Sequence, residues 1–268
     1  MIRKGYSDGP FGQLHWRVAE PDRPASHPDL YCLHPGPYSG IAFTGIMPHL
    51  AKDRRVIAPD YPGFGGSDPF KADPVIAEYG EAMFAVIADI SDDRPVDLMG
   101  FHTGTLVAAE MALMAPDKVG QLALVDIPAF DAETSARYHA MAAQPFDITP
   151  EMNCLEKPWK RGITNRIDSQ GPDRSFEMFT EQLRPGRHMH CAFHAAFTYD
   201  VYGRLPQVQH PTLALATQSE LLDATRWAGQ NMPPAKLVER LDINRAVLDE
   251  AAETIASEII QFLSEDPS

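Results

Sequence analysis

The chain has 268 residues, enough for one large α/β domain with an insertion, and its 44% hydrophobic and 22% charged residues are typical of a globular protein. Its formal net charge of −14 repels phosphate backbones and anionic lipids, so we expect no nucleic-acid partner and no membrane partner. No apolar run approaches the length of a membrane span, and none follows the N-terminus as in a signal peptide. We therefore expect a cytoplasmic protein that binds a small-molecule substrate, and we leave a homodimer open.

Strands and helices are expected to alternate through the first part of the chain. Short apolar runs that end at turn residues predict strands, and apolar residues at helical spacing predict helices. On these patterns, strands are expected over residues 12–19, 29–34 and 55–59, and helices over 40–52 and 74–90. The third strand leads into a glycine-rich loop, Asp60 to Asp68.

The stretch from Pro95 to Ala129 carries the most informative motif. A short apolar run over 96–99 ends at a glycine-framed turn, a helix is expected over 105–114, and a second apolar run covers 122–125. This order predicts a βαβ unit with a site at its turn. The turn reads Gly100-Phe101-His102-Thr103-Gly104, which is the G-x-S-x-G frame of a nucleophile elbow with histidine in place of serine.

The composition changes between residues 130 and 209, where proline, methionine, histidine and aromatic residues become frequent and no clean strand is found. We interpret residues 131–205 as an inserted, mostly helical cap, called the cap segment below, and residues 1–130 and 206–268 as the core. The remaining elements follow: strands are expected over 211–217 and 235–241, and helices over 221–231 and 248–263. The alternation predicts an α/β fold with a mainly parallel sheet and helices on both faces.

On these residues the chain resembles the α/β-hydrolase superfamily, in the cap-bearing branch that includes epoxide hydrolases, haloalkane dehalogenases and carbon–carbon bond hydrolases. The resemblance rests on His34-Pro35-Gly36-Pro37 after one strand, on the loop from Ala58 to Asp68, on the elbow and on the order of the last elements. It implies the α/β-hydrolase fold and a catalytic triad in the chain order nucleophile, acid, histidine.

All three triad positions depart from the family pattern. The nucleophile position is His102, the acid position falls on Glu220, and the histidine position falls on Arg245, because no histidine follows His210. A serine acyl-enzyme is therefore not expected, since position 102 has no hydroxyl and arginine cannot act as a base. The resemblance implies a better preserved oxyanion hole, with the N–H groups of Gly36 and Thr103 as donors.

Three arrangements of these residues stay open at this point. Imidazole and glutamate are longer than the serine and aspartate that they replace, so a contact between His102 and Glu220 would make His102 a general base. Alternatively, Glu220 pairs with Arg245 as a structural ion pair, or Arg245 binds a substrate carboxylate. Asp126, directly after the strand over 122–125, is a second choice for the acid, although it could equally cap a turn.

Several further residues are candidates for substrate contacts. His34 is expected to brace its loop and is kept as a substrate-binding candidate, together with Trp159 and His194 of the cap segment. The spacing His188-x-His190-x-x-x-His194 has no acidic partner at the distance that a zinc protease motif requires, and Cys32, Cys154 and Cys191 match no metal or disulfide pattern. We therefore expect no metal and no cofactor.

Two functions are consistent with this site. The first is an enzyme acting on a small, largely apolar carbonyl or ester compound. In it, His102 activates water without an acyl-enzyme, or removes a proton beside a carbonyl as lyases, isomerases and cyclases do. The second is a catalytically silent protein that keeps the pocket and binds a ligand or partner. Fold alone does not decide between them.

Overall fold

The computed structural model describes residues 1–70 and 73–265, and its centre is a sheet of eight strands in the order β1-β2-β4-β3-β5-β6-β7-β8. β1 and β2 pair antiparallel, β2 also pairs antiparallel with β4, and all other pairs are parallel. The predicted fold class, an α/β fold with a mainly parallel sheet, is confirmed. The strands are β1 (Ile2–Gly9), β2 (Gly12–Ala19), β3 (Leu30–Leu33), β4 (Val56–Pro59), β5 (Val96–Phe101), β6 (Val119–Val125), β7 (Thr212–Thr217) and β8 (Ala235–Arg240).

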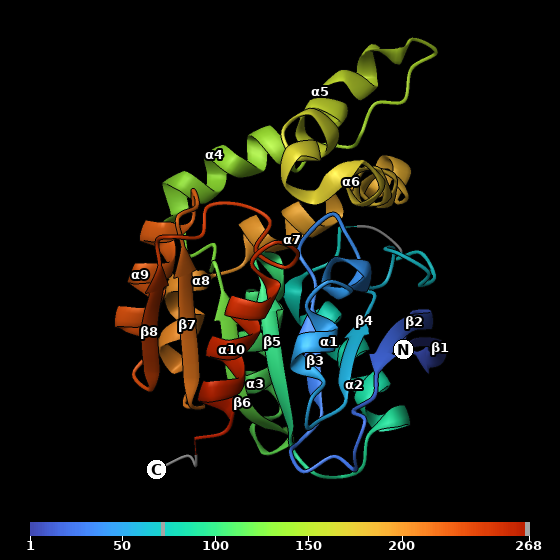
Figure 1. The fold of residues 1–268 in the computed structure, drawn as a ribbon. Helices are drawn as coiled ribbons and strands as arrows, with labels where there is room; N and C mark the ends of the chain where they lie inside the picture. The colour runs from blue at the N-terminus through green and yellow to red at the C-terminus, as the bar shows by residue number, and fades with distance from the viewer. Residues whose placement is uncertain (71–72, 266–268) are drawn as a thin grey trace.

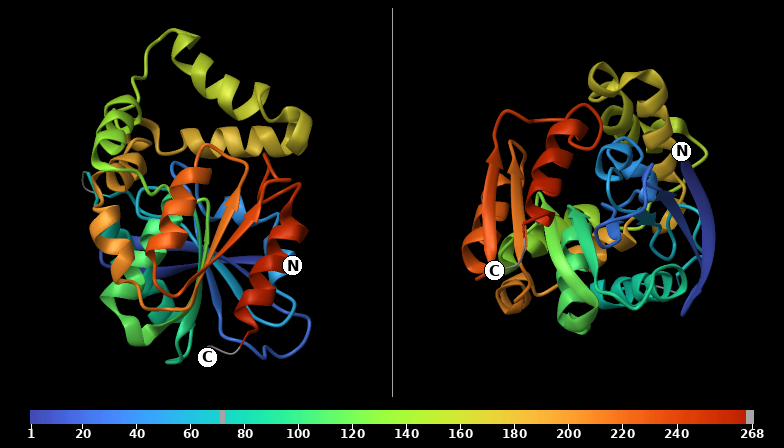
Figure 2. Two further views of the ribbon diagram at one scale, coloured as in Figure 1. Left: turned by 90° about the vertical axis from the view of Figure 1, so that its left-hand side faces the viewer. Right: turned by 60° about the horizontal axis from the view of Figure 1, so that its bottom comes forward.

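Helices cover both faces of this sheet, as Figures 1 and 2 show. On one face, α2 (Ile76–Ile90), α3 (Thr103–Met114) and α9 (Leu222–Asn231) contribute apolar side chains to one core. On the other face, α1 (Met47–Leu50) and α10 (Ala252–Leu263) pack over a second core. The central strands β3 to β7 are almost entirely buried, because both of their faces are covered. Among the described residues, no helix has the length and hydropathy that crossing a bilayer requires.

Two differences from the sequence prediction have clear causes. Strand β1 was not expected, because its sequence IRKGYSDG has few apolar residues and only Ser7 is buried; it forms as the outer half of a hairpin with β2. The helix expected over 40–52 is split into a 3₁₀ turn (Gly40–Phe43) and the short α1, since Pro48 lies in the first turn of α1 and cannot continue a longer helix.

Between β6 and β7 the chain forms only helices and turns. Figure 1 places this part, including α4 (Ala132–Ala142), α5 (Glu156–Trp159), α6 (Ile167–Leu183) and α7 (Cys191–Thr198), above the end of the sheet where β6 leads into α4. The last cap helix, α8 (Val201–Arg204), lies beside α3. Several side-chain hydrogen bonds join α6 to the core; among them, the Ser39 hydroxyl donates to Glu181 Oε1 at 2.5 Å, and Arg174 Nε donates to Asp249 Oδ1 at 3.0 Å.

Candidate active site

The turn between β5 and α3 has the strained geometry of a nucleophile elbow. His102, the residue between strand and helix, has φ 51° and ψ −119°, a conformation that non-glycine residues rarely adopt. The two framing glycines leave no room for a side chain: a Cβ on Gly104 would lie 1.9 Å from the Leu33 carbonyl oxygen, and one on Gly100 would lie 2.5 Å from the Gly104 carbonyl oxygen. The close approach of these backbones holds His102 at the carboxyl edge of the sheet.

The acidic residue facing His102 is Asp126, which directly follows β6. Its Oδ2 lies 4.0 Å from His102 Nε2, and its carboxylate is 1% exposed. The backbone N–H of Thr217 donates to Asp126 Oδ1 at 2.9 Å, and the Thr217 hydroxyl donates to Oδ2 at 2.7 Å. Asp126 also has a positive φ of 53°, so both members of this pair are held in strained backbone conformations at the ends of adjacent strands.

Three influences act on the pKa of His102. Loss of water around the ring lowers the pKa below its ordinary value, the Asp126 carboxylate raises it, and the Arg166 guanidinium lowers it again. The net effect is a lowered pKa. The side chain is nevertheless 42% exposed, so the ring is accessible from outside the core. A neutral, accessible imidazole carries a free lone pair at neutral pH, as a general base requires.

The two predicted oxyanion donors lie beside the elbow. Thr103 is the first residue of α3, and Gly36 follows β3, the strand next to β5. A methyl group added to Gly36 would lie 3.6 Å from Thr103 Oγ1, so the two residues are neighbours. In the part of the chain that the structure describes, neither backbone N–H donates a hydrogen bond to another backbone group. Both donors are therefore free to bind an anionic oxygen.

His34 braces the loop that contains Gly36. Its Nδ1–H donates to the Pro35 carbonyl at 3.0 Å, and its Nε2 accepts the Tyr61 N–H at 3.0 Å. The ring is completely buried, and this burial lowers its pKa to about 4. Both ring nitrogens are bonded inside the core, which supports the bracing interpretation and leaves no exposed atom of His34 for the substrate contact that the sequence suggested.

The structure does not bring Glu220 or Arg245 to His102. Glu220 is exposed after the end of β7, and none of the hydrogen bonds or ion pairs among the described residues joins it to His102 or Arg245. Arg245 is 59% exposed and pairs with Glu250 at 3.2 Å. Both predicted pairings of Glu220 are therefore corrected. Asp126 is the carboxylate that faces His102, because it leaves the strand adjacent to the elbow, whereas Glu220 lies three residues beyond the end of β7.

The sequence comparison agrees with this geometry. Residues 28–145, which include β3, the elbow and Asp126, match the profile of the alpha/beta hydrolase fold family. The match, the eight-stranded sheet and the superposition with solved hydrolase structures agree. The chain has the α/β-hydrolase fold.

Several proteins that are similar to this chain carry the names of hydrolytic enzymes. A pimeloyl-[acyl-carrier protein] methyl ester esterase of Nitrosomonas europaea is 26% identical over 229 residues, covering 79% of this chain and 86% of that protein. A 2-hydroxymuconate semialdehyde hydrolase of Pseudomonas sp. (strain CF600) is 38% identical over 84 residues, 30% of this chain and 28% of that protein. The enol-lactonase of Burkholderia xenovorans LB400 superposes with a TM-score of 0.81 at 17% identity, covering 97% of this chain and 100% of that chain, which shows a shared fold.

Among the described residues, no hydrogen bond, ion pair or ring contact joins the cap residues singled out from the sequence to His102. Trp159 is 47% exposed and packs edge to face on Phe179. It lines a hollow of about 450 Å³ with Phe176 and other cap residues, and His102 is not among them. His194 on α7 is hydrogen-bonded to His139 on α4 at 3.0 Å. Neither side chain is seen in contact with His102.

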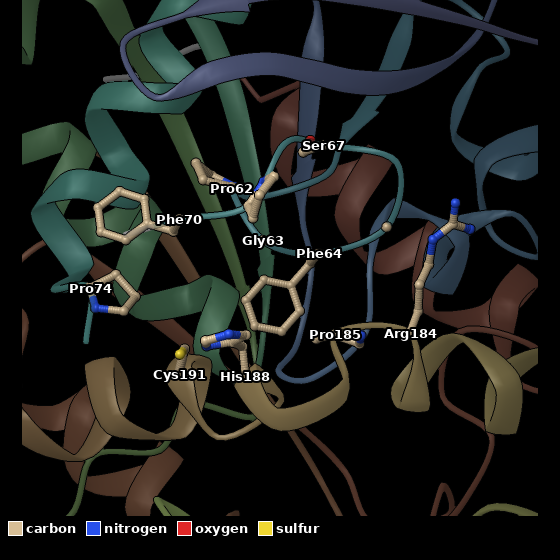
Figure 3. Close-up of a pocket in the computed structure, with 12 residues that line it drawn as sticks. Pro62, Gly63, Phe64, Ser67, Phe70, Pro74, Arg184, Pro185, His188 and Cys191 are labelled. Atoms are coloured by element: carbon tan, nitrogen blue, oxygen red, sulfur yellow. The ribbon is translucent and has the colours of Figure 1, made fainter. Parts of the chain in front are cut away.

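A second hollow, of about 230 Å³, lies between the glycine-rich loop after β4 and the cap segment (Figure 3). Phe64, His188 and Cys191 line it, and His102 does not. The helix α7 packs against Gly36, which neighbours Thr103 of the elbow: a Cβ added to Gly36 would lie 2.5 Å from Ala192 Cβ.

Sequence reasoning missed Arg166, the residue before α6. It is half-buried, its guanidinium lies 5.9 Å from the centre of the Tyr38 ring, and its charge acts on His102. No ion pair or side-chain hydrogen bond of Arg166 is found within residues 1–70 and 73–265. No motif in the cap segment marks this arginine, so only the three-dimensional arrangement reveals it.

Proposed function

We propose that this α/β-hydrolase cleaves a small ester or related carbonyl compound by general-base catalysis, with His102 as the base and Asp126 as its partner. The single observation that supports this most strongly is the position of an exposed imidazole at the elbow, 4.0 Å from a buried carboxylate and beside two free backbone N–H groups. The distance is too long for a direct hydrogen bond, but catalytic contacts in unliganded sites often shorten when substrate binds.

The proposed reaction is a direct attack of water on the carbonyl carbon and forms no acyl-enzyme. One His102 nitrogen accepts a proton from water as the water oxygen attacks the carbonyl carbon, and the N–H groups of Gly36 and Thr103 stabilise the resulting oxyanion. The oxyanion then collapses, the bond to the leaving oxygen breaks, and the imidazolium returns its proton to the leaving alcohol. Asp126 favours the imidazolium through its negative charge and orients the ring. The same base and oxyanion site also suit proton abstraction beside a carbonyl.

The position of Arg166 favours a substrate that carries an anionic group. It is a half-buried cation without a carboxylate partner among the described residues, in a protein whose net charge is −14. A guanidinium binds a carboxylate through two parallel hydrogen bonds, which would fix the substrate relative to His102. We therefore favour a substrate that carries a carboxylate near its reactive carbonyl.

The test is a panel of methyl esters and enol lactones, each with and without a carboxylate, assayed with wild type, His102→Ala and His49→Ala. His49 is a half-buried histidine on α1 and is the matched control. Loss of turnover in His102→Ala alone supports the proposal. A fluorophosphonate probe should not label the protein, since the elbow has no hydroxyl nucleophile at position 102. Covalent labelling of a serine that abolishes activity would contradict the mechanism, and failure of the entire panel to turn over would favour a silent binding protein.

A further inference from the structure

Away from the elbow, three side chains of metal-ligating type meet where the cap segment contacts the core. One carboxylate oxygen of Asp73, one ring nitrogen of His190 and the sulfur of Cys191 all lie within 4.8 Å of one another. Asp73 lies just before α2 in the core, whereas His190 and Cys191 lie at the start of α7. His190 and Cys191 are buried and Asp73 is exposed. We propose that these three residues bind a divalent transition-metal cation of the zinc class.

The orientation of the His190 ring is the first support. Its Nδ1 lies 2.9 Å from the Arg187 carbonyl oxygen, and a carbonyl can only accept, so Nδ1 carries the hydrogen. In the neutral ring the lone pair is then on Nε2, which lies 3.7 Å from Asp73 Oδ1. Two acceptors that face each other at this separation repel unless a proton or a metal cation lies between them. Metal-binding histidines commonly donate their second ring N–H to a carbonyl in this way.

The chemistry of the three ligands selects the metal. Thiolate and imidazole favour Zn²⁺ and Co²⁺ over Mg²⁺ and Ca²⁺, which prefer oxygen ligands. In a tetrahedral zinc site with bonds of about 2.1 Å, the ligand atoms lie roughly 3.4 Å apart. Atoms that lie within 4.8 Å of one another therefore need only small side-chain movements to close around one ion. On binding, the Cys191 thiol loses its proton to solvent and the sulfur bonds to the metal.

The hollow shown in Figure 3 supplies the remaining coordination position. Cys191 and His188 both line it, and their side chains lie next to each other there. A water molecule or a small ligand that enters the hollow could complete the coordination. Because the ligands come from the core and from α7, the metal would join the cap segment to the core. This consequence concerns stability and does not depend on the elbow chemistry.

Sequence spacing alone could not identify this site. The pattern His188-x-His190-x-x-x-His194 suggests His190 and His194 as a pair on one helix, but His194 is bonded to His139 at 3.0 Å instead. The partners of His190 are its neighbour Cys191 and a carboxylate more than a hundred residues away in the chain. The His139 and His194 pair is the rival two-ligand site that the test must separate.

The experiment titrates the full chain, freed of metal by a chelator and dialysis, with Zn²⁺ in a calorimeter and with Co²⁺ in a spectrophotometer. We expect one Zn²⁺ per chain, a sulfur-to-cobalt charge-transfer band, and a melting temperature that rises with Zn²⁺. Cys191→Ser and His190→Ala should weaken binding by roughly 100-fold or more, and Cys191→Ser should remove the band and the rise in melting temperature. Cys154→Ser and His194→Ala are the matched controls and should bind as wild type.

Any of three results would overturn the site. The first is the lack of saturable Zn²⁺ binding by the folded wild-type protein, and the second is unchanged binding in both Cys191→Ser and His190→Ala. The third is loss of binding in His194→Ala alone, which would assign the metal to the His139 and His194 pair. Far-ultraviolet circular dichroism of each variant shows that it is folded, and Cys191→Ala provides a second substitution if the serine variant is not.

Discussion

His102 Nε2 lies 4.0 Å from Oδ2 of Asp126, and both residues have a positive φ at the carboxyl ends of two adjacent strands. The two strained residues therefore converge from β5 and β6 at a single point on the sheet edge. Strain of this kind persists only where the surrounding structure enforces it, and here glycines at 100 and 104 and the Thr217 hydrogen bonds do so. In this arrangement the histidine at the elbow faces a carboxylate directly, and no histidine is needed at the third triad position, which is Arg245 in this chain.

The first prediction separates the two candidate acids. Asp126→Asn should lower kcat by roughly 10²-fold or more, because it removes the charge that favours the imidazolium. Glu220→Gln should leave kcat unchanged, since Glu220 is exposed and makes no contact with His102 in the described structure. Steady-state kinetics on the best ester of the panel provides the comparison. The reverse order of effects would restore Glu220 as the acid.

The second prediction concerns pH and Arg166. Because the pKa of His102 is lowered, kcat/KM should fall on the acid side with a midpoint below 6.5. Arg166→Gln removes a cation that lowers this pKa, so the midpoint should move to higher pH. The same variant should raise KM for carboxylate-bearing esters and not for neutral ones. Arg161→Gln, an exposed cap arginine, is the control and should change neither quantity. An unchanged acid limb in Arg166→Gln would place Arg166 outside the site.

The third prediction uses two buried groups whose pKa values shift in opposite directions. Burial lowers the pKa of His34 from 6.5 to about 4, and burial raises the pKa of Asp97 from 3.8 to about 6. The His34 contribution to stability is therefore complete above pH 6.5 and is lost as the pH falls toward 4. The Asp97 contribution is complete below pH 3.8 and is lost as the pH rises through 6. Each amounts to about 3 kcal/mol.

The two contributions largely cancel in the wild-type protein between pH 4 and 6. Unfolding by urea over this range should show that His34→Gln becomes less stable as the pH rises, and that Asp97→Asn becomes more stable as the pH rises. Slopes of the same sign in the two variants would be inconsistent with these shifts.

The fourth prediction tests the packing under the elbow. Gly104→Ala places a methyl group 1.9 Å from the Leu33 carbonyl oxygen, where only backbone movement can make room. We expect a loss of about 4 kcal/mol or more, or no folded protein. Gly186→Ala is the control, because its φ of 56° is unfavourable but no atom lies within 4 Å of the added methyl group. Its cost should be about 1 to 2 kcal/mol. Equal urea midpoints for the two variants would show that the elbow is not tightly packed.

Much of the fold was predictable from sequence because the buried strands are continuous apolar runs bounded by turn residues. The sharp turn between strand and helix at His102 was also predicted, since the glycines at 100 and 104 indicate a close backbone approach that leaves no room for a side chain. The carboxylate nearest His102 was the second choice from sequence, because Asp126 and Glu220 both follow core strands, and sequence does not show which of them turns toward the elbow. Arg166 was missed because the cap segment has no periodic pattern that indicates which side chains face the core.

The most direct test of the central claim is chemical rescue of His102→Ala. If His102 is a general base, added imidazole should enter the space left by the ring and restore turnover in a saturable way. Rescue by substituted imidazoles should increase with their basicity, as general-base catalysis requires. Wild type, assayed at the same imidazole concentrations, corrects for uncatalysed reaction with imidazole. Turnover by His102→Ala at the wild-type rate, or an inactive variant that no imidazole restores while wild type is active, would contradict the account.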